Sequence, residues 1–172
     1  RFLGWRRAVS MDFKAPGDAV FWVGPEPEAA LARSELALAL SLDDDALKSP
    51  AAKGDFDYAG FEAATAKGLV ASAQASGWGG AAAALARSAM AGGLAANVKA
   101  DWSTAQWFTE SAGGLLVTTA DADAGAFEAT VGSARRIGTV TDTDTLSMDG
   151  EAVSLAALLE AYRSEESGEI NR

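Results

Sequence analysis

Apolar residues follow two patterns along this chain. Short runs of consecutive apolar residues predict strands, and longer segments with apolar residues every three or four positions predict helices. Glycine, proline and aspartate separate most of these segments, as is typical of turns. Strands and helices alternate throughout without an internal repeat. We therefore expect an α+β fold, with one mixed β-sheet and helices packed on it.

The clearest predicted strand is AVFWV at residues 19–23, a run of strand-favouring residues between turn-forming segments. This pattern predicts a buried strand. Asp149-Gly150 is a typical hairpin turn and follows a predicted strand at residues 145–148. A rough alternation of apolar residues over residues 1–13 predicts an edge strand or a linker strand. Further strands are predicted at residues 69–73, 94–98, 115–119 and 135–140.

Helices are predicted at residues 28–42, 56–67, 81–91, 101–110, 122–131 and from residue 155 onwards. The last has apolar residues at i, i+3, i+4 and i+7, and Ser154 is placed to cap it. Asp55 is expected to cap the helix at residues 56–67. The three aspartates at 43–45 diverge on any regular backbone. A solvated loop or a helix cap is therefore favoured there over a cation site.

The same pattern sets the expected domain limits. Residues 1–14 are expected to be a linker or edge strand, residues 15–166 a single domain and residues 167–172 a polar tail. The chain has 172 residues, a length that suits one domain. Its first residue is Arg rather than Met, so we expect it to be a piece of a longer protein.

The amino-acid composition argues against several kinds of binding partner and site. The formal net charge is −10 and there is no basic cluster beyond the pairs Arg6-Arg7 and Arg135-Arg136, which argues against a nucleic-acid-binding protein. The chain has no cysteine and no histidine, so disulfides, thiol catalysis and zinc sites built from these residues are excluded. No apolar run approaches the ~20 residues of a membrane span, and no signal peptide is visible. We expect a cytoplasmic protein that binds neither nucleic acid nor membrane.

A glycine-rich loop, SGWGG at residues 76–80, precedes the predicted helix at residues 81–91. Such a loop presents free backbone N–H groups and the positive end of the helix dipole, which suit a phosphate or a carboxylate. The alternative is that the glycines let the helix pack close to the sheet and bind nothing. The residues alone leave both interpretations open.

The stretch at residues 67–98 also resembles a known family. It keeps the motifs GLV, GG, ALA and MAGGL in the order seen in the C-terminal domain of the aminoimidazole-ribonucleotide-synthetase superfamily. Within that superfamily it is most similar to the phosphoribosylformylglycinamidine synthases, the amidine-forming ligases of purine biosynthesis. Further motifs follow in family order at residues 9–24, 107–111 and 135–140, so the resemblance covers nearly the whole chain.

The resemblance implies the C-terminal domain of an ATP-dependent ligase that uses ammonia from glutamine. ATP and Mg²⁺ would be held mainly by an N-terminal synthetase domain, with none bound tightly by this domain alone. A glutamine amidotransferase domain or subunit would be a further partner. The candidate substrate- or phosphate-binding residues carried over are Ser72, Gly77, Gly79 and Gly80, with Ser34 and Glu35 from a weaker Ser-Glu match. No catalytic residue and no metal ligand is assigned.

This chain departs from the family pattern in the glycine loop. Gln74 replaces a histidine, Ala75 and Trp78 replace aspartates, and Gly77 replaces a serine. Trp78 would fill the pocket that a ligand otherwise occupies. We therefore expect the domain to be inactive alone. Two alternatives stay open: a non-catalytic structural half of a large fused synthase, or a domain of another ATP-using relative such as thiamine-monophosphate kinase or selenophosphate synthetase.

Overall fold

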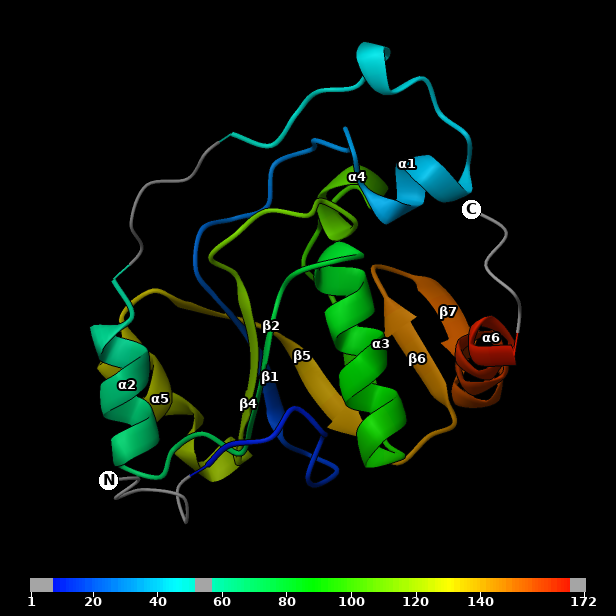
Figure 1. Ribbon diagram of the computed structural model, residues 1–172. Coiled ribbons are helices and arrows are strands. Elements are labelled where there is room, and N and C mark those ends of the chain that lie inside the picture. The colour runs from blue at the N-terminus through cyan, green and yellow to red at the C-terminus, as the bar shows by residue number, and fades with distance from the viewer. Residues whose placement is uncertain (1–7, 52–56, 168–172) are drawn as a thin grey trace, which may run out of the picture.

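One mixed sheet of seven strands runs through the molecule, in the spatial order β2-β4-β1-β5-β3-β6-β7 (Figure 1). The computed structural model describes residues 8–51 and 57–167. All neighbouring strands are antiparallel except β3 and β6, which are parallel. The strands are β1 (Ala19–Val23), β2 (Ser72–Ala75), β3 (Ala95–Val98), β4 (Leu115–Thr119), β5 (Ala134–Thr141), β6 (Thr145–Met148) and β7 (Glu151–Ser154).

The central strand is β1, which lies between β4 and β5. All five of its residues are buried, because helices cover both faces of the sheet at this point. The prediction of a buried strand at residues 19–23 is confirmed. So is the expected α+β class with helices packed on a mixed sheet.

The helices form a layer on each side of the sheet (Figure 1). Helices α2 and α5 pack together on one face, and α3 and α6 pack together on the other. None of the helices in the described residues is long and apolar enough to cross a membrane. The helices are α1 (Glu35–Ala39), α2 (Ala59–Ala66), α3 (Gly80–Gly92), α4 (Thr104–Trp107), α5 (Ala124–Val131) and α6 (Leu155–Ser167), with short 3₁₀ turns at Asp44–Ala46 and Asp121–Asp123.

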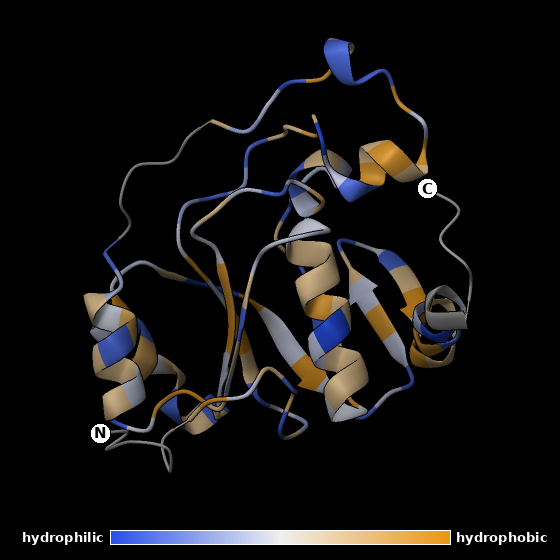
Figure 2. Ribbon diagram, viewed as in Figure 1, coloured by the Kyte–Doolittle hydropathy of each residue, from blue (hydrophilic) through white to orange (hydrophobic). Residues whose placement is uncertain are grey.

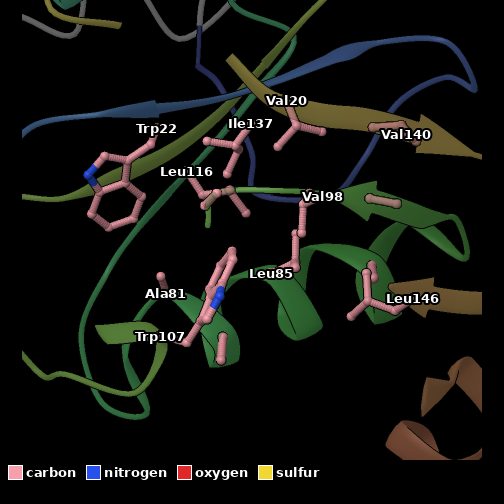
Figure 3. Close-up of a cluster of buried hydrophobic side chains, with 14 of the residues drawn as sticks. Val20, Trp22, Ala81, Leu85, Val98, Trp107, Leu116, Ile137, Val140 and Leu146 are labelled. Carbon is pink, nitrogen blue, oxygen red and sulfur yellow. The ribbon is translucent and has the colours of Figure 1, made fainter. Parts of the chain in front are cut away.

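Two apolar cores result from these layers. The larger lies between the sheet and α3, where Ala81 and Leu85 face Val20 and Ile137 of the sheet (Figure 3). The smaller lies on the opposite face and centres on Phe21 and Phe127, whose ring centroids are 5.0 Å apart. The larger core extends over α4, so it packs directly behind the glycine loop.

The helix predicted at residues 28–42 is wrong in most of its length, since only Glu35–Ala39 is helical in α1. The N–H of Ala30 donates instead to the Thr109 hydroxyl, and the N–H of Ala32 donates to the Lys48 carbonyl. Arg33 then adopts a positive φ of 62°, which no helix accommodates. The leucines of the predicted apolar face are not buried: Leu38 is 75% exposed, and α1 stands out as an apolar surface segment (Figure 2).

Several element ends also differ from the prediction. The strand predicted at residues 69–73 lies at Ser72–Ala75, and residues 8–14 run as an irregular segment. Within it, Phe13 is buried and its N–H donates to the Ser88 carbonyl of α3. Asp55, residues 1–7 and residues 168–172 lie outside the described residues. Helix α2 begins at Ala59, whose N–H donates to the Asp57 carboxylate at 2.8 Å.

The hairpin and the last helix are confirmed. Strands β6 and β7 pair antiparallel across Asp149 and Gly150, whose φ angles are 49° and 94°. Positive φ at both central residues is the geometry that a tight hairpin requires. The Ser154 hydroxyl accepts a hydrogen bond from the N–H of Ala157 at 3.1 Å, and so caps α6 as expected.

Candidate functional site

The glycine loop joins β2 to α3 at one end of the sheet. Gly79 and Gly80 have φ angles of 77° and 67°, a conformation that favours glycine. The N–H of Gly80 donates to the Gly77 carbonyl at 2.8 Å, which closes the loop into a tight turn. The loop therefore presents backbone atoms, rather than side chains, at the start of α3.

Steric space differs strongly among these glycines. A Cβ added at Gly80 would lie 2.5 Å from the Trp107 carbonyl oxygen, so the loop rests directly on the backbone of α4. A Cβ at Gly77 would meet nothing within 4 Å. The close approach of α3 to α4 thus explains Gly80 without any ligand, whereas Gly77 has no steric reason to be glycine.

A carboxylate from elsewhere in the chain occupies the loop. Oε1 of Glu110 accepts a hydrogen bond from the Gly79 N–H at 2.9 Å and another from the Glu35 N–H at 2.7 Å. One oxygen atom therefore brings the glycine loop at residues 76–80 next to Ser34-Glu35, the segment of the weaker Ser-Glu match. Sequence reasoning gave Glu110 no role, although it lies in the matched motif at residues 107–111.

Ser34 and Glu35 are used differently from each other. The buried Ser34 hydroxyl accepts a hydrogen bond from the N–H of Ala37 at 3.1 Å, which caps α1. Glu35 lies in the first turn of α1 with its side chain exposed. The Glu35 side chain is therefore a solvated carboxylate at the start of α1. Its contribution to the loop is its backbone N–H.

Ser72 lies apart from this cluster, at the opposite end of β2 from the glycine loop. It is buried, and its hydroxyl is hydrogen-bonded to the Thr118 hydroxyl of β4 at 2.6 Å. The expectation that Trp78 fills a pocket is wrong, because its side chain is 78% exposed. Its carbonyl oxygen accepts a hydrogen bond from Arg87 at 3.2 Å.

A groove of about 600 Å³ opens beside the loop, between α3, α4, α6 and the β6–β7 hairpin. Its walls are the alanine face of α3 and the aromatic side chains of α4, with Met148 opposite. The Asp149 carboxylate stands at its edge. It accepts hydrogen bonds from the Trp107 indole and from the N–H groups of three consecutive residues, Ala100, Asp101 and Trp102.

These bonds determine the charge state of Asp149. Burial by itself raises the pKa of its carboxyl, but the hydrogen bonds from the Trp107 indole and three backbone N–H groups outweigh burial. The net effect holds the pKa below its usual value. Asp149 is thus a fully hydrogen-bonded structural anion, and its carboxylate is not free to bind a ligand in the groove.

Nothing in the described part of the chain resembles a metal site, since no three Asp or Glu side chains converge there. Two of the three aspartates at 43–45 accept hydrogen bonds from backbone N–H groups, and Asp43 caps the 3₁₀ turn at Asp44–Ala46. Asp43 accepts a hydrogen bond from the N–H of Asp45 at 3.2 Å, and Asp44 accepts one from the N–H of Arg33 at 2.6 Å. These two carboxylates are thus engaged by backbone N–H groups rather than converging on a common point.

Comparison with known families decides what kind of domain this is. Residues 15–151 match the family described as AIR synthase related protein, C-terminal domain. The chain belongs to this family. This AIR synthase C-terminal domain has no significant match among curated protein sequences.

Solved structures share the fold. Thermotoga maritima PurL complexed with FGAR has a TM-score of 0.73 and 18% identity, over 90% of this chain and 30% of that one. Phosphoribosylformylglycinamidine synthase II from Thermotoga maritima has a TM-score of 0.66 and 18% identity, over 90% and 28%. The hydrogenase maturation protein HypE in complex with ATP has a TM-score of 0.61 and 18% identity, over 87% and 53%.

The AIR synthase C-terminal domain therefore spans about a third or less of the PurL chains and about half of the HypE chain. At these identities the likeness establishes the fold.

Proposed function

We propose that this chain is the C-terminal domain of a phosphoribosylformylglycinamidine synthase, the ATP-dependent amidine-forming ligase of purine biosynthesis. The observation that carries the proposal is the family match over residues 15–151 together with the fold of FGAR-bound PurL over 90% of the chain. The ordered motifs at residues 9–24, 67–98 and 107–111 support the same assignment.

In this proposal the domain supplies position rather than chemistry. An N-terminal synthetase domain holds ATP and Mg²⁺, and a glutamine amidotransferase delivers ammonia. Structures of PurL complexed with ATP and with AMPPCP support ATP as a ligand of the whole protein. The domain closes one side of the active site with its glycine loop, and Gly77, Gly79 and Gly80 line that side. Such a role in purine biosynthesis is exercised in the cytoplasm.

A second candidate function is a non-catalytic, structural half of a large fused synthase. The replacements Gln74, Ala75 and Trp78 remove the histidine and acidic side chains of the family loop. The Glu110 carboxylate also takes a backbone N–H of the loop that a substrate anion would otherwise use. These two observations favour assembly without chemistry in this half of the protein.

Activity of the whole protein that carries this domain tests the proposal. We expect formation of formylglycinamidine ribonucleotide from formylglycinamide ribonucleotide, ATP–Mg²⁺ and ammonia, with ADP released in equal amount. We expect no turnover by residues 1–172 alone. Each reaction is run with the substrate omitted, so that unproductive ATP hydrolysis is subtracted.

The outcomes separate the candidates. Turnover that depends on the ribonucleotide supports the synthase. A folded whole protein that binds the ribonucleotide but does not turn it over supports the structural half. ATP consumption that the ribonucleotide does not stimulate contradicts the synthase and directs attention to other ATP-using relatives, among which the likeness to HypE is already visible.

A further inference from the structure

The Glu110 carboxylate contacts two backbone segments that are far apart in the sequence. Its Oε1 atom lies 2.7 Å from the Glu35 nitrogen and 2.9 Å from the Gly79 nitrogen. Glu35 is the first residue of α1, and Gly79 is the N-cap of α3. One oxygen atom thus serves the starts of both helices.

Neither of these N–H groups has another acceptor within the part of the chain that the structure describes. Gly79 has no side chain with which to cap α3. A carboxylate that accepts two N–H groups makes charge-assisted hydrogen bonds, which are shorter and stronger than bonds between neutral groups. The negative charge also lies at the positive end of the α3 dipole. Glu110 therefore does for the loop what a bound anion would do.

The attachment of Glu110 strengthens this arrangement. It follows Thr109, which is 1% exposed and whose hydroxyl is hydrogen-bonded to the segment before α1 through Ala30. Two neighbouring residues thus hold the segment of residues 30–35 against α4. Only Glu110 continues the contact to the glycine loop.

We propose that Glu110 is the resident anion of the glycine loop: its carboxylate fills the anion position between the Gly79 and Glu35 N–H groups and fastens the loop to the start of α1. An external anion reaches these N–H groups only by displacing this carboxylate. This role of Glu110 goes beyond the proposed synthase function, because it holds for any reaction of the parent protein.

Amide hydrogen exchange measured by NMR on residues 1–172 tests this directly. In Glu110→Ala the amides of Gly79 and Glu35 lose their acceptor, and we expect them to exchange about tenfold faster or more. Glu128→Ala is the matched control, because Glu128 is an exposed glutamate of α5 on another part of the fold. It should leave both amides unchanged.

Formate then serves as a chemical replacement for the carboxylate that the alanine removes. We expect added formate to slow exchange of the Gly79 and Glu35 amides in Glu110→Ala and to have no effect on them in the unmodified chain. Equal exchange rates with and without Glu110, or a formate effect of the same size in both proteins, would overturn the proposal. So would the absence of any formate effect in the variant.

A second variant keeps the test decisive if Glu110→Ala does not fold. Glu110→Gln preserves the size of the side chain and one acceptor oxygen but removes the charge. We expect the same two amides to exchange faster than in the unmodified chain, though by less than in the alanine variant. Unchanged exchange in Glu110→Gln contradicts a role for the charge.

Discussion

The indole N–H of Trp107 donates to the Asp149 carboxylate at 2.7 Å, and this bond joins α4 to the β6–β7 hairpin turn. The same carboxylate collects the N–H groups of three consecutive residues that lead from β3 into α4. A turn residue thereby orders the backbone on which the aromatic wall of the groove is built. Trp102 and Trp107 of this wall pack against each other with ring centroids 4.8 Å apart, and Trp22 of the core packs edge-on against Trp102 at 5.2 Å.

Replacing Asp149 with alanine should therefore lower the free energy of unfolding by roughly 3 kcal/mol or more, since four donors, most of them part-buried, lose their acceptor at once. Alanine also tolerates the positive φ of this position poorly. Urea unfolding at pH 7 measures the loss. Asp142→Ala, an exposed aspartate in the preceding turn, should change stability by less than about 0.5 kcal/mol.

The effect of Asp149 should depend on pH. Its folded pKa is depressed, so its contribution to stability is present above the usual aspartate pKa of about 3.9 and is lost as the pH falls through the lower folded value. The difference between Asp149→Ala and the unmodified protein should accordingly shrink in strong acid. A difference that grows as the pH falls would contradict the assignment of a bound anion.

Asp12 and Asp18 should respond to pH in opposite ways. Burial raises the pKa of the Asp18 carboxyl, only partly offset by a backbone hydrogen bond at Ala15, and its Oδ2 atom has no partner among the described residues. A raised folded pKa stabilises the protein below the unfolded value and loses that contribution as the pH rises through the folded value. Asp18→Asn should therefore stabilise the protein at pH 7, with a gain that disappears in acid.

Asp12 is the matched control for Asp18. Hydrogen bonds from Lys14 and Ser10 lower its pKa to about 2. Asp12→Asn should lower the free energy of unfolding at pH 7. This loss should vanish as the pH falls from about 4 through the folded pKa. Denaturant unfolding of both variants from pH 7 downward measures the two trends. If both substitutions shift stability in the same direction at pH 7, the burial argument for Asp18 fails.

The glycine loop provides a pair of variants that differ in the space available for an added Cβ atom. Gly80→Ala should destabilise the protein by more than about 2 kcal/mol, because a Cβ there lies 2.5 Å from the Trp107 carbonyl oxygen and φ is positive. Gly77→Ala should stay within about 0.5 kcal/mol, since its Cβ meets open space. Thermal unfolding of the two proteins is the measurement. A loss of stability in Gly80→Ala as small as in Gly77→Ala would show that α4 shifts easily to make room for the Cβ atom.

Two tryptophans give a further contrast. Trp107 is 2% exposed and Trp78 is 78% exposed. Trp107→Ala should cost about 3–5 kcal/mol, whereas Trp78→Ala should cost less than about 0.5 kcal/mol. Denaturant unfolding followed by circular dichroism compares them without relying on the fluorescence of the residue removed. A large loss in Trp78→Ala would mean that its ring packs against the protein after all.

Local chemistry explains which parts of the fold were predictable. The strand at residues 19–23 and the glycine-bounded helix α3 follow from propensities and turn residues within a short window. The hairpin at Asp149 and the cap at Ser154 follow from the same kind of short-range signal. The alternation of these strand and helix patterns along the chain was enough to predict a mixed sheet with helices packed on it.

Long-range hydrogen bonds explain what was missed. Residues 28–34 have helix-favouring composition, but Thr109 takes the Ala30 N–H and prevents helix formation there. Glu110 acts on Glu35 and Gly79 at sequence separations of 75 and 31 residues. The hydrophobic periodicity of a sequence carries no information about contacts between residues so far apart along the chain. The replacement of a small acidic residue by Trp78 suggests a filled pocket, but the backbone of the loop turns this ring into solvent.

The position of β1 has a consequence for synthesis of the chain. Ala19 faces Thr119 on one side and Thr139 on the other, so this strand emerges from the ribosome long before either neighbour exists. Until residues 115–141 are made, AVFWV is an apolar segment with unpaired edges on both sides, the kind of segment that associates with other nascent chains. Pairing of the central strand must therefore wait for the second half of the chain.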